Sequence, residues 1–352
     1  MPYTTINKSS LYRNTTLITG NNSTQAFTGL GFAPAMIWTK KRNGATNHLL
    51  YDKVRGVGKY LYPNLQNAEG GNGTDSGLSA FGTDGFTLTN GDDANGSGAT
   101  GVAWSWKAGT TGSGTTTGSG TGKAYSYSVD TTSGFSVIKY VGNGSSGHTI
   151  PHHLGVTPSF MIVKRVNSAS TSWMVYHKDL GATKNMILDG TNAEADDDSI
   201  WNDTAPNATN FTCGSSTSTN GNDDTYMCYA FVEKVGYSKV SSYTGNGDNG
   251  QGPFVYCGFK PSFVLIKNST DAGELWEMFD DKRIGYNAKN NRFYANDSDA
   301  EDTSAERLDL LSNGFKIRTT GSHVNESGDT MIYMAFAENP IVGSNNIPTT
   351  AR

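Results

Sequence analysis

The sequence is poor in cysteine, in charge and in long apolar runs, and each shortage excludes a class of protein. Its 352 residues include three cysteines, Cys213, Cys228 and Cys257, too few for a disulfide framework, so we expect reduced, buried thiols. The net charge is -5 and the 27 Lys and Arg form no basic run, so nucleic acid is not an expected partner. No apolar stretch resembles a signal peptide or reaches the ~18 residues of a membrane helix, so we expect neither export by that route nor membrane insertion.

Motifs that carry catalysis or bind metals are also missing. The chain has no Gly-x-Ser-x-Gly elbow, no Walker loop, no His-Glu-x-x-His and no Cys-x-x-Cys. We therefore expect no enzyme activity and no cofactor. His148, His152 and His153 crowd one segment, but adjacent side chains on a strand point to opposite faces, so we do not expect a shared metal ion.

Acidic clusters occur in segments of loop composition, among them NDSDAED at 296–302. Hard cations prefer several carboxylate and carbonyl oxygens on a flexible loop, which makes Asp297 and Asp299 weak candidates for surface Ca²⁺. The segment lacks the central Gly and final Glu of an EF-hand loop. Solvated loop charge is the favoured interpretation.

Glycine, by contrast, is abundant, with 43 residues in the chain. Part of this excess belongs to a pattern that occurs three times, as GLGFAPAMIWTK, HLGVTPSFMIVK and YCGFKPSFVLIK. In each copy a Pro follows a Gly by three residues and a Lys follows it by nine. The nine motif residues are Gly31, Pro34, Lys40, Gly155, Pro158, Lys164, Gly258, Pro261 and Lys267.

The motif residues have a mechanical interpretation. Proline fixes φ and cannot donate to a β-ladder, so it belongs at the first residue of a strand, and the preceding Gly supplies an unusual turn. The Lys ends the strand, where we expect a charge that leaves the core for solvent. A ligand-binding role for these lysines is the alternative.

A second shared spacing is Asp-x-x-Arg, present as Asp52 with Arg55 and as Asp280 with Arg283. It predicts a local ion pair beside a loop. The second copy has His177 in place of the aspartate. A feature kept in two copies and absent from the third indicates a structural bridge rather than catalysis.

The repeated pattern predicts an all-β protein of three tandem β-sandwich-like domains of about 100 residues each. We place the domains at 1–108, 129–235 and 236–340, with a Gly/Thr/Ser linker at 109–128 and a C-terminal tail at 341–352. A barrel per repeat is the alternative to a sandwich.

Individual strands differ in their expected burial. Continuous apolar runs such as SFMIVKR predict central strands covered on both faces, whereas YMCYAFVE and MIYMAFAE alternate like strands with one wet face. SAERLDLLS at 304–312 is the one helix candidate, and a single turn is equally expected there.

The segment 109–122, GTTGSGTTTGSGTG, contains only Gly, Thr and Ser. Such a composition buries no apolar surface and is typical of a flexible linker. It lies between the first and second copies, so we expect a hinge there and a stiffer junction between the second and third.

Most tryptophans occupy expected strand positions and are interpreted as core residues, namely Trp38, Trp104, Trp106, Trp173 and Trp276. Trp201 differs because it lies in the loop-like segment WNDTAPN. An aromatic ring on a loop can stack on a ligand, so Trp201 is a candidate ligand contact.

The chain resembles a family of virion-associated proteins of marine tailed bacteriophages. The resemblance rests on the opening MPYTTINKSS, the repeated YxGNG…GxxPxFxxxK, the segment DLLSNGFKIR and the ending MIYMAFAENPIVGSNN, and covers essentially the whole chain. Members are described as uncharacterised phage proteins, sometimes as tail fibres. The resemblance implies a virion location, with assembly in the host cytoplasm, and assigns no catalytic residue.

These observations lead to three hypotheses. The first is a non-enzymatic virion structural protein, tail or fibre associated, whose polar loops contact host-surface glycan or protein. The second is a capsid decoration protein. The third, a glycan-degrading enzyme, needs a carboxylate pair about 5–10 Å apart, and the sequence nominates none. Expected partners are other virion proteins and further copies of the chain, a trimer being one such assembly.

Overall fold

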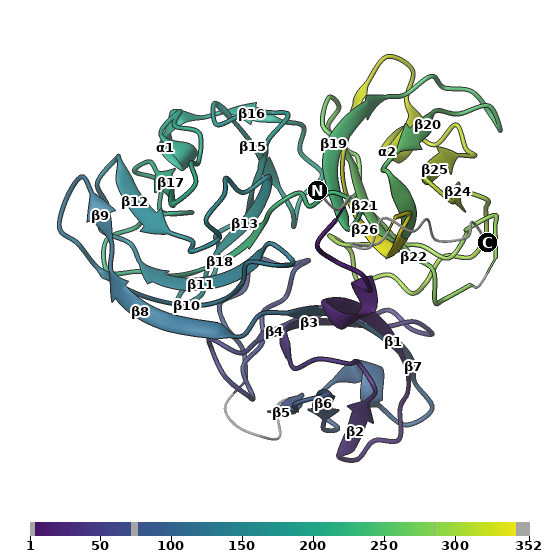
Figure 1. The fold of residues 1–352 in the computed structure, drawn as a ribbon, viewed down its shortest axis with the longest axis horizontal. Coiled ribbons are helices and arrows are strands. Elements are labelled where there is room, and N and C mark those ends of the chain that lie inside the picture. Colours follow the sequence, from purple (N-terminus) through teal and green to yellow (C-terminus); the bar gives the residue numbers. More distant parts are fainter. Residues whose placement is uncertain (1–3, 72–76, 285, 343–352) are drawn as a thin grey trace.

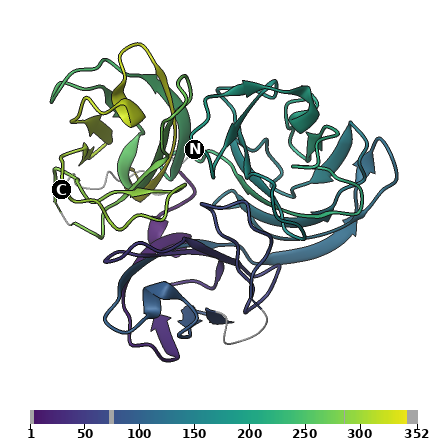
Figure 2. The same cartoon turned by 180° about the vertical axis from the view of Figure 1, so that it is seen from behind.

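The computed structural model describes residues 4–71, 77–284 and 286–342. Most of the predicted tail at 341–352 therefore lies outside the described residues. The chain forms three lobes around a common centre, as Figure 1 shows from one side and Figure 2 from the opposite side. We call residues 4–108 lobe 1, residues 109–235 lobe 2 and residues 236–342 lobe 3.

Each lobe is a sandwich of a larger and a smaller antiparallel sheet, as expected for an all-β fold. In lobe 1 the sheets are β1-β7-β3-β4 and β2-β6-β5, from β1 (Arg13–Thr19), β2 (Gln25–Thr28), β3 (Pro34–Lys41), β4 (Leu49–Asp52), β5 (Leu78–Phe81), β6 (Gly85–Leu88) and β7 (Thr100–Lys107). In lobe 2 they are β16-β15-β14-β13-β18-β11-β10-β8 and β17-β12-β9, from β8 (Thr110–Thr115), β9 (Thr117–Gly118), β10 (Ala124–Asp130), β11 (Phe135–Val141), β12 (His148–Pro151), β13 (Phe160–Arg165), β14 (Met174–His177), β15 (Lys184–Ile187), β16 (Ala195–Asp196), β17 (Asn210–Cys213) and β18 (Thr225–Phe231). In lobe 3 they are β19-β26-β21-β22-β23 and β20-β25-β24, from β19 (Ser238–Thr244), β20 (Phe254–Tyr256), β21 (Phe259–Asn268), β22 (Glu277–Asp280), β23 (Phe293–Tyr294), β24 (Leu308–Leu311), β25 (Gly314–Ile317) and β26 (Thr330–Pro340).

Helical structure is limited to single turns in the described part of the chain: η1 (Ser9–Leu11), η2 (Asp93–Asn95), α1 (Asp198–Trp201) and α2 (Ser322–Asn325). None of these helices is long and apolar enough to cross a membrane. The segment 304–312 is not a helix, because residues 308–311 form β24 and pair with β25.

The three lobes share one hydrophobic core. One face of each larger sheet packs on the smaller sheet of its own lobe, and the other face turns to the centre of the molecule. Trp106, Phe231 and Phe336 come from the equivalent strands β7, β18 and β26 and meet there, with ring centroids 6.2, 5.9 and 5.9 Å apart. This aromatic triad marks an approximate threefold axis.

The shared core corrects the expected wet face of the terminal strands. Residues 226–231 of β18 and 331–337 of β26 are all buried. Their alternating pattern is real, but both faces are covered, one by the lobe's own smaller sheet and the other by the neighbouring lobes.

The prediction of a flexible linker is wrong for much of the segment 109–122. Residues 110–115 form β8, which pairs in register with β10, and residues 117–118 form β9, which pairs with β12. The glycines serve this pairing because the rings of Tyr127 and Tyr125 lie over Gly112 and Gly114. A Cβ added at Gly112 would lie 2.6 Å from the Tyr127 hydroxyl.

The motif turns follow the expected mechanics in part. Gly31, Gly155 and Gly258 have φ of 84, 74 and 79°, in the region that glycine adopts at least cost. Pro34 begins β3 as predicted. Pro261 is instead the third residue of β21, at a register irregularity that tolerates its missing N–H.

Truncation of the aromatic triad tests whether the lobes unfold together. Phe336→Ala removes a ring from the shared core and should lower the free energy of unfolding by about 3–5 kcal/mol. Denaturation followed by tryptophan fluorescence and by circular dichroism should show one coincident transition for the native protein and the variant.

The matched control is Phe254→Ala, since Phe254 is 48% exposed and its loss should change stability by about 0.5 kcal/mol or less. Separate transitions for the two probes would contradict a core shared by all lobes.

Candidate functional site

The charged residues singled out in the sequence gather at the seams, by which we mean the three contacts between neighbouring lobes. Asp52, His177 and Asp280 end the equivalent strands β4, β14 and β22. Each contacts the strand of the next lobe that is equivalent to β7: Asp52 contacts β18, His177 contacts β26 and Asp280 contacts β7 itself. The seams therefore run in one direction around the ring, from lobe 1 to 2, from 2 to 3 and from 3 back to 1.

Hydrogen bonds to these residues cross each seam. Asp52 Oδ2 accepts from the Tyr229 hydroxyl at 2.8 Å, and Asp280 Oδ2 accepts from Trp104 Nε1 at 3.0 Å. At the remaining seam His177 Nε2 lies 3.4 Å from the carbonyl oxygen of Tyr333. The residue of lobe 3 equivalent to Trp104 and Tyr229 is a methionine, Met334, which offers no such donor. The carboxylate is thus present where the next lobe supplies a proton donor.

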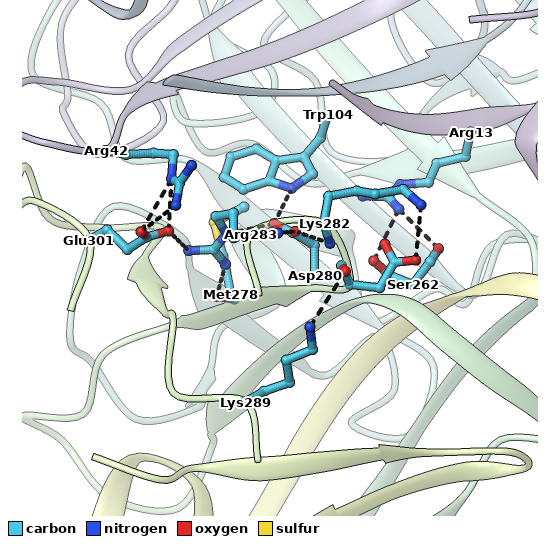
Figure 3. Close-up of polar contacts among 11 residues, drawn as sticks. Arg13, Arg42, Trp104, Ser262, Met278, Asp280, Lys282, Arg283, Lys289 and Glu301 are labelled. Carbon is cyan, nitrogen blue, oxygen red and sulfur yellow. Dashed lines mark hydrogen bonds and ion pairs between the residues drawn. The ribbon is translucent and has the colours of Figure 1, made fainter. Parts of the chain in front are cut away.

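The predicted Asp-x-x-Arg ion pairs are confirmed, but they are buried rather than beside surface loops. Arg283 Nε lies 2.7 Å from Asp280 Oδ2 and its Nη2 donates to the Met278 carbonyl at 3.0 Å (Figure 3). Burial raises the pKa of Asp280, yet the adjacent Arg283 outweighs this and holds that pKa below its ordinary value. Glu301 joins the same network by binding both Arg283 and Arg42 of lobe 1 (Figure 3).

The three motif lysines are not solvated strand ends. Lys40, Lys164 and Lys267 are at most 1% exposed. Lys40 Nζ donates to the carbonyl of Ser298 in lobe 3 at 3.2 Å, and Lys164 Nζ donates to that of Gln66 in lobe 1 at 3.0 Å. Burial lowers the pKa of each of the three lysines to about 8.

A loop of each lobe clasps the next lobe. The carbonyls of the equivalent residues Gln66, Thr191 and Ser298 accept backbone N–H groups from the following lobe at 3.1, 2.8 and 2.9 Å. Trp173 and Trp276 occupy equivalent positions, and their indole N–H groups donate to carbonyls of the preceding lobe at 3.0 Å (to Tyr62) and 2.9 Å (to Ile187). All three seams therefore use backbone carbonyls at equivalent positions as hydrogen-bond acceptors.

Arg13 caps one end of the shared core. Its guanidinium carbon lies 4.8 Å from the Phe263 ring centroid and 5.7 Å from that of Trp106. Nη1 donates to Ser262, whereas Nε and Nη2 have no acceptor among the described residues. Arg13 lines a pocket of about 40 Å³, room for roughly two or three water molecules. Asp281 lines it too, so the charge of Arg13 is balanced within the chain.

Trp201 is not available for ligand stacking. It is 1% exposed and packs edge-on against Tyr176 inside lobe 2, at a ring centroid distance of 6.1 Å. Trp201 is the last residue of α1, and it is buried together with Ile200 in the hydrophobic core of lobe 2.

The candidate calcium ligands Asp297 and Asp299 flank Ser298 in the clasp loop of lobe 3. Asp297 Oδ1 accepts the backbone N–H of Asp299 at 3.1 Å. The ammonium of Lys40 binds the carbonyl between them, so a cation already lies beside this loop. In the described part of the chain, no group of three or more His, Cys, Asp and Glu side chains is placed to hold a metal ion.

The histidine cluster is divided and the cysteines are buried. His148 hydrogen-bonds Asn220 and Thr116, while His153 stacks on Tyr127 at a ring centroid distance of 3.7 Å. All three cysteines are free and buried, as expected.

Two surface features were not anticipated from the sequence. A groove of about 290 Å³ lies between the loop at Lys53 and strands β8 and β10, and hydroxyl side chains line it, namely Thr111, Ser113, Ser126 and Ser128. Strand β20 lies on the outer side of lobe 3 (Figure 1), and its residues Phe254 and Tyr256 have 48% and 60% of their surface exposed. The sequence signal for this pair is the alternation of outward and inward side chains in PFVYC, which becomes apparent when β20 is aligned with the equivalent strands β2 and β12.

Residues 8–340 match the sequence model of a family described as a domain of unknown function (DUF7483). The chain belongs to this family. No curated protein and no solved structure matches it. The match runs across all three lobes, in agreement with a unit that has one shared core.

Removal of a seam carboxylate tests its structural role. Asp280→Ala leaves Arg283 buried without its partner and deprives Trp104 of an acceptor, so the free energy of unfolding should fall by about 3–5 kcal/mol. Asp196→Ala is the control, because its 3.5 Å contact with Lys184 is exposed and is worth about 1 kcal/mol or less. Urea denaturation measures both, and equal losses would contradict a special role for the seam.

The buried lysines predict a pH dependence of stability. The pKa of Lys164 is about 8 in the folded state and about 10.4 in the unfolded state. As the pH rises, the folded state therefore loses this proton at a lower pH than the unfolded state does. Stability therefore gains from this residue as the pH rises between these values. Lys164→Met should lack that gain.

The measurement is the difference in unfolding free energy between the native protein and Lys164→Met, taken at about pH 7.5 and about pH 9.5. Burial raises the pKa of Cys213 and of Cys257 to about 12, which opposes the lysine effect, but both proteins share it and it cancels. Parallel pH profiles would show that Lys164 keeps its ordinary pKa.

Proposed function

We propose that this chain is a non-enzymatic structural protein of a phage virion, exposed on the particle and associated with the tail or its fibres. The observation that carries the proposal is the closed ring of lobes. Its buried ionisable groups hydrogen-bond across the seams, and its aromatic residues form one core. Such a body resists local opening, which suits a component that must persist outside the cell.

The resemblance in sequence to virion-associated phage proteins supports this location. The outer surface supports a contact role, because the hydroxyl-lined groove and the exposed rings of lobe 3 offer polar and aromatic groups to host-surface glycan. Other virion proteins and further copies of the chain are the proposed partners. No cofactor is part of the proposal.

One observation favours capsid decoration as the second candidate. The three lobes are related by an approximate threefold axis through Trp106, Phe231 and Phe336. A body with that symmetry matches a threefold position of a capsid lattice, where one chain would satisfy three equivalent contacts.

The copy number per particle tests both candidates. Quantitative mass spectrometry of purified particles should find the chain at a few to some tens of copies if it belongs to the tail, and at hundreds if it decorates the capsid. A density map of the particle should locate it accordingly. Its absence from purified particles would overturn both.

The non-enzymatic character needs a separate measurement. Purified protein incubated with host-surface polysaccharide should release no oligosaccharide. Release that a single Asp or Glu substitution abolishes, in a variant that still folds, would instead establish a glycan-degrading enzyme.

A further inference from the structure

We propose that Phe254 and Tyr256 form a carbohydrate-binding platform on the outer face of lobe 3, which stacks on the pyranose rings of a surface glycan. The inference rests on the proposed function for its biological setting and deepens it by assigning sugar binding to this pair of residues and stating how they contact the sugar. It is carried by a comparison within the chain itself.

Strands β2, β12 and β20 are equivalent in the three smaller sheets; β2 and β20 lie at a sheet edge, whereas β12 lies between β17 and β9. The middle residue of each strand, Phe27, Ile150 or Val255, pairs with a buried phenylalanine of the neighbouring strand. The residues on either side face outward. Lobe 1 places Ala26 and Thr28 there, lobe 2 places Thr149 and Pro151, and lobe 3 places Phe254 and Tyr256.

The aromatic pair is therefore not a requirement of the fold. The same strand forms in lobes 1 and 2 with small or non-aromatic side chains at these positions. Side chains that remain 48% and 60% exposed gain little from folding. An exposed aromatic pair on a sheet edge also invites aggregation, so its presence requires another benefit.

The neighbouring residues suit a sugar. Residues two apart on a strand lie on one face about 7 Å apart, so successive rings of a glycan can cover both aromatic side chains. Phe254 pairs across the sheet with Lys316, which pairs in turn with Asp309. The Lys316 ammonium is thus carried on the strand beside the Phe254 ring, and Asp309, paired with Arg318 at 3.6 Å, lies one strand further away. The hydroxyls at the edge of a pyranose need such hydrogen-bond partners.

The polar groups beside the rings extend beyond Lys316. Tyr256 itself pairs with Gly314, where an added Cβ would lie 2.0 Å from the Val255 carbonyl oxygen, so close backbone contact accounts for this glycine. Gln251 Oε1 lies 3.5 Å from Lys316 Nζ and adds an amide to the polar row. The surface thus combines flat apolar rings with donors and acceptors at their edge.

Other occupants fit less well. Two aromatic side chains offer about 300–500 Å² even when fully covered, well below the ~800 Å² per partner of a stable protein interface. Nucleic acid could stack on the rings, but the chain carries a net charge of -5, which opposes phosphate binding.

The test uses the full chain and a panel of oligosaccharides, neutral and uronate-containing, with saturation-transfer NMR and calorimetry as readouts. The native protein should bind at least one member at millimolar concentration. The double variant F254A/Y256T introduces the residues of lobe 1 at both positions and should fold normally, with affinity reduced at least about tenfold.

The matched control is Tyr286→Ala, which removes an aromatic side chain that is 72% exposed elsewhere on lobe 3 and should leave binding unchanged. Equal affinity in native protein and F254A/Y256T would overturn the platform, as would a lack of binding to every sugar. Self-association of the native chain that F254A/Y256T abolishes would also overturn it and identify an interface between copies. None of these outcomes alters the copy number on particles, so the proposed virion role is judged separately.

Discussion

The structure depends on one constraint, which is that each lobe is too thin to bury its own central face. A larger and a smaller sheet cover only one face of the larger sheet, and the other face carries Trp106, Phe231 or Phe336. These rings leave water only when all three lobes meet. The hydrophobic effect thus acts on the ring as a whole, and the lobes become parts of one cooperative unit.

Closure of the ring places polar groups in the same dry environment, where each must find a partner. The seams solve this with a common device, a backbone carbonyl of one lobe facing a donor of the next. Two seams also have an aspartate that accepts a hydrogen bond from Tyr229 or from Trp104 of the next lobe. At the third seam the equivalent residue of the next lobe is Met334, and His177 occupies the position of the aspartate. The residue at one seam position therefore depends on its partner in the neighbouring lobe rather than on its own sequence context.

This dependence explains which predictions succeeded. Local patterns were sufficient for the β class, the buried thiols, the Asp52–Arg55 pair and the unusual turn at Gly31. Local patterns failed where the environment of a residue comes from a distant segment. Lys164 was predicted as a solvated strand end, but its ammonium is buried and donates to the Gln66 carbonyl. The segment 109–122 was predicted as a linker, but Tyr125 and Tyr127 lie over its glycines. The exposure of Phe254 and Tyr256 could be recognised only after β20 was aligned with the equivalent strands β2 and β12.

The seam between lobes 1 and 3 also sets the order in which the protein can assemble. Trp104 meets Asp280 across 176 residues of sequence, and Arg13 meets Ser262 across 249. Contacts of such separation form late and slowly. During synthesis the central face of lobe 1, with three tryptophans, must wait until β21 and β22 have emerged from the ribosome. The nascent chain therefore presents a large apolar surface for most of its translation, and chaperones that hold such surfaces have the longest opportunity to bind at that stage.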